Sequence, residues 1–553
     1  MVSAFARGNT AAFGEVAQSV YGATVHNVGG GIAAYANGTA VGVSASASAG
    51  TVLVDGGSDV TAISQQGTAT AITASGYYGT TVDVSGEITA VGRTGATGIR
   101  ALSSAGDVSV TNGDLVFAYT VNGNAIGLYG YSLYGNTSIT NSGDVTAISV
   151  NGLADAIFAS GADVSIVNSG ALYANGNTWA AGIEAQGTGM TSVQNDGDIT
   201  AYARAAGAHA FGIYTTGDAG VSIDNTGNIQ AQGYYATGIY ASSAGGSITL
   251  GNSGNITAGY VYAGSYYSAL ATGIDAMSGG VGAAVDITNS GDISAFGYYG
   301  ATGISVVSSG LGGTASVDNS GNLTVAQGSK YGYGANGIFV SADGDALITN
   351  SGSITVNSAG AAAGAVALSF AGDASVVNSG DISVDSTAFL GYNAYGVVAF
   401  SGNGGAMASN SGSIDVTTKY IGVGMDVGGL TGATADNSGD IMVDAWRAYG
   451  IRAQSGNGDV VVDNSGTIYA TYSGGYGGTA FGILGIGTNG NVAIDNSGEI
   501  VTYVGGQSVG VFGVSSYGDV SVDNTGAITA YSGSGIADAI FASGYVVDVD
   551  NSG

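Results

Sequence analysis

Apolar and polar positions alternate in short segments along this chain. In residues 460–470, Val460 and Val462 precede a polar tripeptide and Ile468 and Ala470 follow it, with one residue between the members of each pair. Alternation with a period of two is typical of strands that bury one face. The stretch therefore predicts two short strands joined by a corner at residues 464–466.

The corner tripeptide Asn-Ser-Gly recurs along the chain, with Asn-Thr-Gly and Asn-Asp-Gly as variants. Successive copies lie 27 to 37 residues apart, and degenerate copies extend the series back to Asn27, which gives about 19 repeats. Self-similarity at such a period indicates a repeat architecture. The clear copies begin at Asn141, Asn168, Asn195, Asn225, Asn252, Asn289, Asn319, Asn350, Asn378, Asn410, Asn437, Asn464, Asn496, Asn524 and Asn551.

Each repeat contains three alternating segments. Isoleucine, leucine or valine stands four residues after the corner Asn, as at Ile199; a Gly-Ile pair marks the second segment, as at Ile213; and valine or isoleucine precedes the next corner, as at Ile223. One such unit cannot bury its own apolar face, so units must stack. We predict an all-β fold, a single parallel β-helix with three short strands per coil and about 19 coils, continuous over residues 1–553.

The corner residues have a structural explanation. Stacked Asn amides can hydrogen-bond to one another and to their own turn. We expect the Gly two residues after each Asn to adopt a positive φ, which glycine tolerates.

Composition narrows the function. The 553 residues include 38 acidic and 8 basic residues, for a net charge of −30, and no cysteine or proline. Nucleic acids and anionic membranes attract basic surfaces, so neither is an expected partner. We expect no disulfide, no certain cofactor and no membrane insertion, since no apolar run reaches 18 residues. Neither a signal peptide nor capping repeats are visible, and we expect a fragment of a longer array.

Acidic residues gather beside the later corners. Asp precedes the corner Asn in successive repeats, and further carboxylates stand on the other side of the same corner. Flexible, oxygen-rich sites suit Ca²⁺. The sequence predicts a weak calcium site at Asp436, Asp440, Asp463, Asp495, Glu499 and Asp523.

Repeat length varies mainly between the corner and the Gly-Ile pair. This variable loop is rich in tyrosine, and exposed aromatic rings bind sugars and proteins. The predicted ligand contacts are Tyr234, Tyr235, Tyr266, Tyr267, Tyr298, Tyr299, Tyr331 and Tyr333.

Catalytic chemistry is poorly supported. Hydrolysis of polysaccharides needs paired carboxylates, and Asp155, Glu184 and Asp275 stand on different coils, so we expect no cluster. The two histidines, His26 and His209, lie in no triad pattern. We expect no enzymatic activity.

Three motifs carry a family resemblance: DNSGDI at 436–441, ATGIYA at 236–241 and GDVSV at 518–522. They resemble the passenger regions of Gram-negative autotransporters (type V secretion), and the likeness covers essentially the whole chain. The resemblance implies a right-handed β-helix at the bacterial surface or outside the cell. The family's translocator barrel and signal are not seen here.

We therefore expect a cell-surface or secreted structural and adhesive protein that binds surface glycans or proteins of host or bacterial cells, or itself, through its Tyr-rich loops. Two alternatives stay open. One is the protomer of a self-assembling extracellular filament, because exposed strand edges favour end-to-end stacking. The other is a polysaccharide-active β-helix enzyme.

Overall fold

The computed structural model describes residues 4–262, 265–266, 268–387, 391–474 and 477–553, and these contain strands and no helix. All but two of the strands fall into three parallel sets of 19, so the fold is the predicted β-helix of about 19 coils with three strands per coil. The other two, β29 (Val261–Tyr262) and β30 (Ser265–Tyr266), pair with each other in antiparallel fashion. The chain divides into two compact units, Met1–Tyr260 and Val261–Gly553. The single continuous domain over residues 1–553 stays a prediction.

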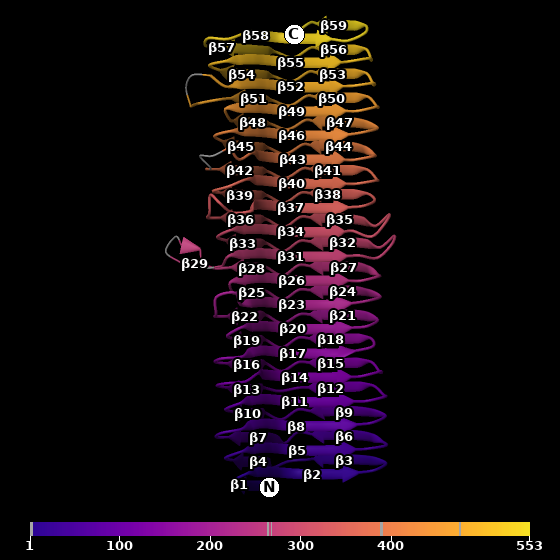
Figure 1. Cartoon of the computed structure of the whole chain (residues 1–553), viewed down its shortest axis with the longest axis vertical. Helices are drawn as coiled ribbons and strands as arrows, with labels where there is room; N and C mark the ends of the chain where they lie inside the picture. Colours follow the sequence, from indigo (N-terminus) through magenta and orange to yellow (C-terminus); the bar gives the residue numbers. More distant parts are fainter. Residues whose placement is uncertain (1–3, 263–264, 267, 388–390, 475–476) are drawn as a thin grey trace. The chain divides into compact units, whose positions relative to one another are not determined.

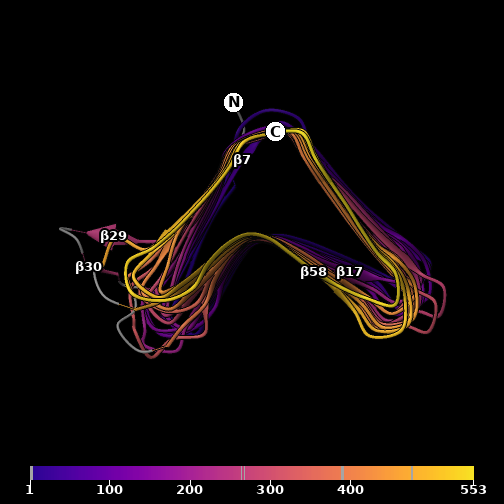
Figure 2. The same ribbon diagram turned by 90° about the horizontal axis from the view of Figure 1, so that it is seen from above.

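One coil of the first unit illustrates the repeat. It consists of β22 (Ile199–Ala203), β23 (His209–Gly217) and β24 (Gly220–Asn225), and Figure 1 shows such strands following one another. Viewed from above with the chain rising toward the reader, each coil turns counterclockwise, which is a right-handed helix (Figure 2).

The second strand of each coil positions the candidate site described below. In the first unit these strands are β2 (Ala11–Ser19), β5 (Thr39–Ala47), β8 (Thr68–Gly76), β11 (Gly95–Ser103), β14 (Ala125–Ser132), β17 (Leu153–Gly161), β20 (Trp179–Gly187), β23 and β26 (Tyr235–Ser243). In the second unit they are β31 (Leu270–Ser278), β34 (Gly300–Ser308), β37 (Gly334–Ala342), β40 (Ala362–Ser369), β43 (Ala394–Ser401), β46 (Ile421–Gly429), β49 (Arg447–Ser455), β52 (Thr479–Gly487), β55 (Gln507–Ser515) and β58 (Ala537–Ser543).

The predicted inward columns form the core. In the coil described above, Ile199, Ile213 and Ile223 are at most 2% exposed. Each lies in register with an aliphatic residue of the next coil, as Ile199 does with Ile229. Burying a side chain of this size contributes about 1.5–3 kcal/mol, so the columns provide the main apolar stabilisation of each coil.

The second strand departs from simple alternation, and this changes the shape of the coil. In β23 the neighbours Gly212 and Ile213 are both buried, and the register with β26 passes over Gly212. A Cβ on Gly212 would lie 2.2 Å from Cγ2 of Ile229 and 2.6 Å from the carbonyl oxygen of Gly238. The strand bends at this position, and its outer face is concave (Figure 2).

The corner asparagines form the predicted amide ladder. Asn195 is fully buried; its Nδ2 donates to the carbonyl oxygen of Gly197 at 2.7 Å and to Oδ1 of Asn225 at 2.7 Å. Equivalent bonds join successive corners elsewhere in both units, for example Asn437 to Asn464 and Asn464 to Asn496. The ladder pairs buried amides that would otherwise cost about 1–3 kcal/mol each.

The expectation for the corner glycines was wrong. Gly197, like the other glycines of the clear corner copies, has no positive φ. Glycine stands there because coils approach closely: a Cβ on Gly197 would lie 2.0 Å from the carbonyl oxygen of Gly170 in the preceding coil. The requirement is for space between coils, not for a left-handed backbone.

The amide ladder of the first unit has an unsatisfied end. Oδ1 of Asn112 is buried without a hydrogen-bond partner, and its counterpart in the preceding coil is Val84, which offers no donor. The Val84 side chain is 5% exposed.

We predict that Val84→Asn stabilises the first unit by about 1 kcal/mol, because the new amide would donate to the orphaned Oδ1 of Asn112. The thermal midpoint of unfolding should rise, and amide hydrogen exchange should slow around residues 84 and 112. The matched control is Val82→Asn, which places an amide in the fully buried core and should lower the midpoint. A lower midpoint for both variants would contradict the explanation.

Candidate functional site

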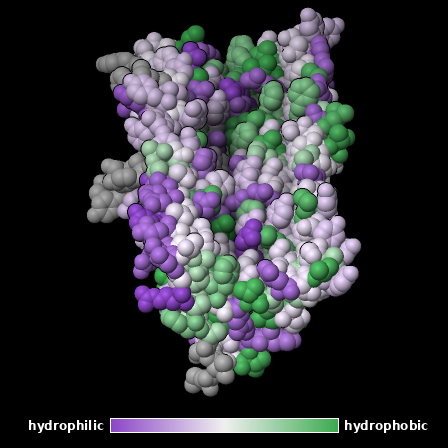
Figure 3. All heavy atoms as spheres, turned by 60° about the horizontal axis from the view of Figure 1, so that its bottom comes forward, coloured by the Kyte–Doolittle hydropathy of each residue, from purple (hydrophilic) through white to green (hydrophobic). Residues whose placement is uncertain are grey.

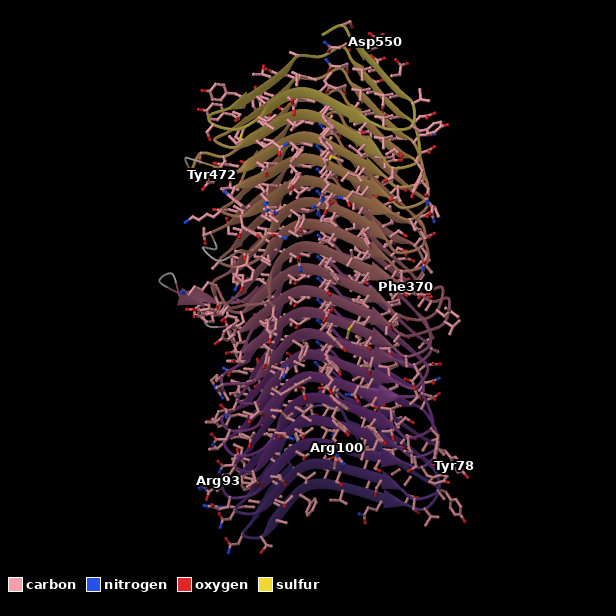
Figure 4. All side chains as sticks on the ribbon, turned by 45° about the horizontal axis from the view of Figure 1, so that its top comes forward. Tyr78, Arg93, Arg100, Phe370, Tyr472 and Asp550 are labelled. Atoms are coloured by element: carbon pink, nitrogen blue, oxygen red, sulfur yellow. The ribbon has the colours of Figure 1, made fainter. Side chains whose placement is uncertain are left out.

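The concave outer face of the second strands gathers aromatic rings in the first unit. Three columns of outward residues run from coil to coil: Trp179, His209 and Tyr235 in the first; Asp155, Ala181 and Phe211 in the second; and Phe158, Glu184, Tyr214 and Tyr240 in the third. Figure 3 shows the hollow on this face with apolar side chains along it. Arg100 also lies on this face, between the edges marked by Arg93 and Tyr78 in Figure 4.

The rings contact one another closely. Trp179 lies 4.8 Å from Phe211 and 5.4 Å from Tyr214, and Phe211 lies 5.1 Å from Tyr214, measured between ring centroids. Tyr214 stacks on Tyr240 at 5.0 Å, almost parallel. Aromatic pairs at these separations add about 0.5–1.5 kcal/mol beyond area burial.

Two carboxyl groups lie among these rings. Asp155 is 3% exposed, and Nε1 of Trp179 donates to its Oδ1 at 3.1 Å. Glu184 accepts a 2.6 Å hydrogen bond from Nε2 of Gln186. Burial, together with repulsion by Glu184, raises the pKa of Asp155 well above its usual range, and burial also raises the pKa of Glu184.

The expectation that Asp155, Glu184 and Asp275 form no cluster was wrong for the first two. Asp155 and Glu184 lie on β17 and β20, which pair directly, and they repel each other through the protein. In the register of the two strands, Asp155 pairs with Ala181, which lies three residues before Glu184. Aligning the repeats by sequence therefore does not place the two carboxyls at equivalent positions. Asp275 lies in the second unit on β31, where burial raises its pKa and a hydrogen bond from Ser305 lowers it.

The predicted calcium residues form a column on the third strands. Asp436, Asp463, Asp495 and Asp523 lie in register on successive coils. Partial burial and repulsion from Asp495 and Asp436 raise the pKa of Asp463. Asp440 and Glu499, across the corner, are exposed. Within the described ranges, no group of three or more His, Cys, Asp or Glu residues is arranged to hold a metal ion, and calcium binding stays a prediction.

The predicted tyrosine contacts lie along the edge of the concave face, in the loops that lead into the second strands. Tyr234 and Tyr235 meet edge to face at 4.9 Å. Tyr298 and Tyr299 do the same at 4.8 Å. Their role as ligand contacts stays a prediction.

The remaining tyrosines of that prediction differ in exposure. Tyr331 and Tyr333 are 73% and 87% exposed. Tyr266 ends the short strand β30 (Ser265–Tyr266), and only its backbone is described. Tyr267 lies outside the described residues.

The second unit has a groove on its own concave face. Its volume is about 370 Å³, and its lining includes Tyr333, Phe339, Val366, Tyr395, Phe400 and Asp426. Arg452 forms a two-point ion pair with Asp426 and lies over the ring of Tyr449 at 5.7 Å. Sequence reasoning missed this lining, although Phe339, directly after the Gly337-Ile338 pair, lies in the groove and carries the signal.

Within the part of the chain that the structure describes, no helix is long and apolar enough to cross a membrane.

We predict that Asp155→Asn raises the unfolding midpoint at pH 7. The pKa of this carboxyl is higher in the folded chain than in the unfolded chain, where it is about 3.9. Ionisation therefore destabilises the fold, and this cost grows as the pH rises from about 3.9 through the folded pKa. Asn keeps the acceptor for Trp179 and carries no charge, so the gain should fade as the pH approaches 4.

Asp381→Asn is the control of opposite sign. Hydrogen bonds from the hydroxyl and backbone N–H of Ser413 lower the pKa of Asp381. Its carboxylate therefore stabilises the fold above the usual Asp pKa and loses that effect as the pH falls through the folded pKa. Asp381→Asn should lower the midpoint at pH 7. If the unfolding midpoint at pH 7 moved in the same direction in both variants, the opposite pKa shifts of Asp155 and Asp381 would be contradicted.

Comparison of the chain with models of protein families, with curated proteins and with solved structures finds no match. The structure supports the sequence resemblance at the level of a β-helix repeat protein. The narrower likeness to autotransporter passengers stays a prediction.

Proposed function

We propose that this chain is a cell-surface or secreted structural and adhesive β-helix whose contact surface is the concave outer face of its second strands. The observation that carries the proposal is the rows of half-buried aromatic rings along this face in each unit. In the first unit Tyr129 stacks on Phe158 at 4.9 Å, and Trp179, Phe211 and Tyr214 cluster beyond them.

The second unit repeats this arrangement with different residues. Phe481 lies 5.5 Å from Tyr449 and 5.7 Å from Phe512, and Phe512 stacks on Phe541 at 4.7 Å. A row of aromatic contacts repeated from coil to coil gives many weak binding points to an extended partner, and avidity then multiplies their effect. This favours a glycan chain or a protein surface over a small molecule in a deep pocket.

The tyrosine-rich loops extend the same surface. Tyr235 is the first residue of β26 and stacks on His209 at 4.6 Å, and Tyr333 precedes β37 and lines the groove of the second unit. Tyr235 and Tyr333 therefore link their loops to the concave face of their own unit. The negative net charge disfavours anionic polymers as partners.

The motif resemblance supports a location at the bacterial surface or outside the cell, as in autotransporter passengers. The self-assembling filament and the polysaccharide-active enzyme stay predictions.

Surface display on a non-adherent bacterium tests the proposal. Phe481→Ser with Phe512→Ser should reduce attachment to host cells or sedimentation by aggregation about thirtyfold, because two contacts of about 1 kcal/mol each are lost. The matched control is Phe370→Ser with Tyr517→Ser, which removes two rings that are 68% and 74% exposed in the turns after the second strands. Equal adhesion by the two variants at equal display would contradict the proposal.

A further inference from the structure

Among the residues that the structure describes, neither Asp155 nor Glu184 forms an ion pair with a base. Oδ1 of Asp155 accepts from Trp179, whereas Oδ2 makes no hydrogen bond to any described residue and is not sealed from solvent. The side chain is nonetheless 97% buried, being 3% exposed. A nearly buried carboxylate oxygen without a hydrogen-bond donor has the capacity to accept a hydrogen bond from a ligand.

No base is among the described groups that set the pKa values of the pair. Besides burial, Glu184 and Trp179 act on the pKa of Asp155, and Gln186 and Trp179 act on the pKa of Glu184; none of these groups is cationic. Arg100, on the same face, is placed over the ring of Tyr129 at 6.0 Å. Burial lowers the pKa of His209, which keeps this neighbour of Trp179 neutral at pH 7. A cation beside the pair would favour its ionised form, which burial disfavours.

The surrounding rings favour an organic cation over a bare metal ion. Trp179, Phe211 and Tyr214 stand within 5.4 Å of one another beside the carboxyls. Aromatic rings attract ammonium groups and also pack against the carbon atoms next to them. Metal ions would require further oxygen ligands, and the described residues offer no group of three.

We propose that Asp155 and Glu184, with Trp179, Phe211 and Tyr214, form a subsite that binds the protonated amine of an unacetylated amino sugar in a surface polysaccharide. The ammonium group donates to Oδ2 of Asp155 and to the Glu184 carboxylate, and the apolar side of the sugar packs on the rings. This inference rests on the proposed function, because the subsite lies on the concave face that we propose as the contact surface. A neutral N-acetyl group carries no charge and supplies a single N–H, so it cannot bridge both carboxyls.

Tryptophan fluorescence tests the subsite directly, because the chain contains 2 tryptophans and Trp446 can be replaced. In a full-length Trp446→Phe background, a glucosamine hexamer should change the emission of Trp179 in a saturable way. The titration is run at 0.15 M salt, where long-range attraction to the acidic surface is screened within about 8 Å. The N-acetylglucosamine hexamer, of equal length and uncharged, should bind at least tenfold more weakly.

Asp155→Asn and Glu184→Gln should each weaken binding of the glucosamine hexamer about tenfold, since each removes one charge-assisted hydrogen bond. Asp275→Asn is the matched control, because Asp275 is another buried acid on a second strand, with a raised pKa and without these rings. It should leave affinity unchanged. Circular dichroism establishes that each variant is folded.

Three outcomes would overturn the inference: equal binding of the two hexamers, equal loss of affinity in the Asp275→Asn control, or binding of a lysine decapeptide but not of the glucosamine hexamer. If the ammonium subsite fails while the Phe481 and Phe512 variants still lose adhesion, the proposed function stands without it. Loss of hexamer binding in Asp155→Asn, together with unchanged adhesion in the Phe481 and Phe512 variants, would support the subsite and contradict the broader role of the face.

Discussion

Parallel stacking of coils makes each side chain meet its own counterpart, roughly 4.8 Å further along the axis. This constraint decides which residues the fold accepts at each position. Amides gain from it, because one amide both donates and accepts, and the buried chain from Asn195 to Asn225 uses both functions. Aromatic rings gain as well, as in the stack of Tyr214 on Tyr240. Stacking disfavours carboxylates: burial, together with repulsion from its counterparts Asp495 and Asp436, raises the pKa of Asp463.

Carboxylates that occur in this fold despite the stacking constraint therefore need a physical explanation. Water screens the repulsion within the exposed Asp column, so that two unit charges at this separation repel by about 0.9 kcal/mol. Asp155 and Glu184 lie in a drier setting, among rings and without a base among the groups that set their pKa. The fold stabilises neither of them by stacking, and this distinguishes the pair from every amide or aromatic ladder in the chain.

The architecture could be predicted from the sequence because stacking makes the same residue type recur at the same position of successive repeats. The Ile199 and Ile213 columns and the Asn ladder were all visible as repeats and are buried as predicted. The reason predicted for the corner glycines, a positive φ, was wrong. Glycine is needed because Gly197 approaches Gly170 of the preceding coil closely, and this contact between coils cannot be seen in the local sequence. The bend at Gly212 and Ile213 was missed because two adjacent inward residues break the period of two. The carboxyl pair was missed because its members belong to different columns, on β17 and β20, and interact electrostatically from one coil to the next.

The central claim is that the concave face of the second strands is the surface that meets a partner. Hydroxyl-radical footprinting of the displayed protein, with and without bound cells, measures this directly at individual rings. We expect protection of Trp179, Phe211, Phe481 and Phe512 on binding, and no change at Tyr78 or Phe370, each of which lies at an edge of its own unit (Figure 4). Protection of Tyr78 and Phe370, with no change at the four rings of the concave face, would contradict it.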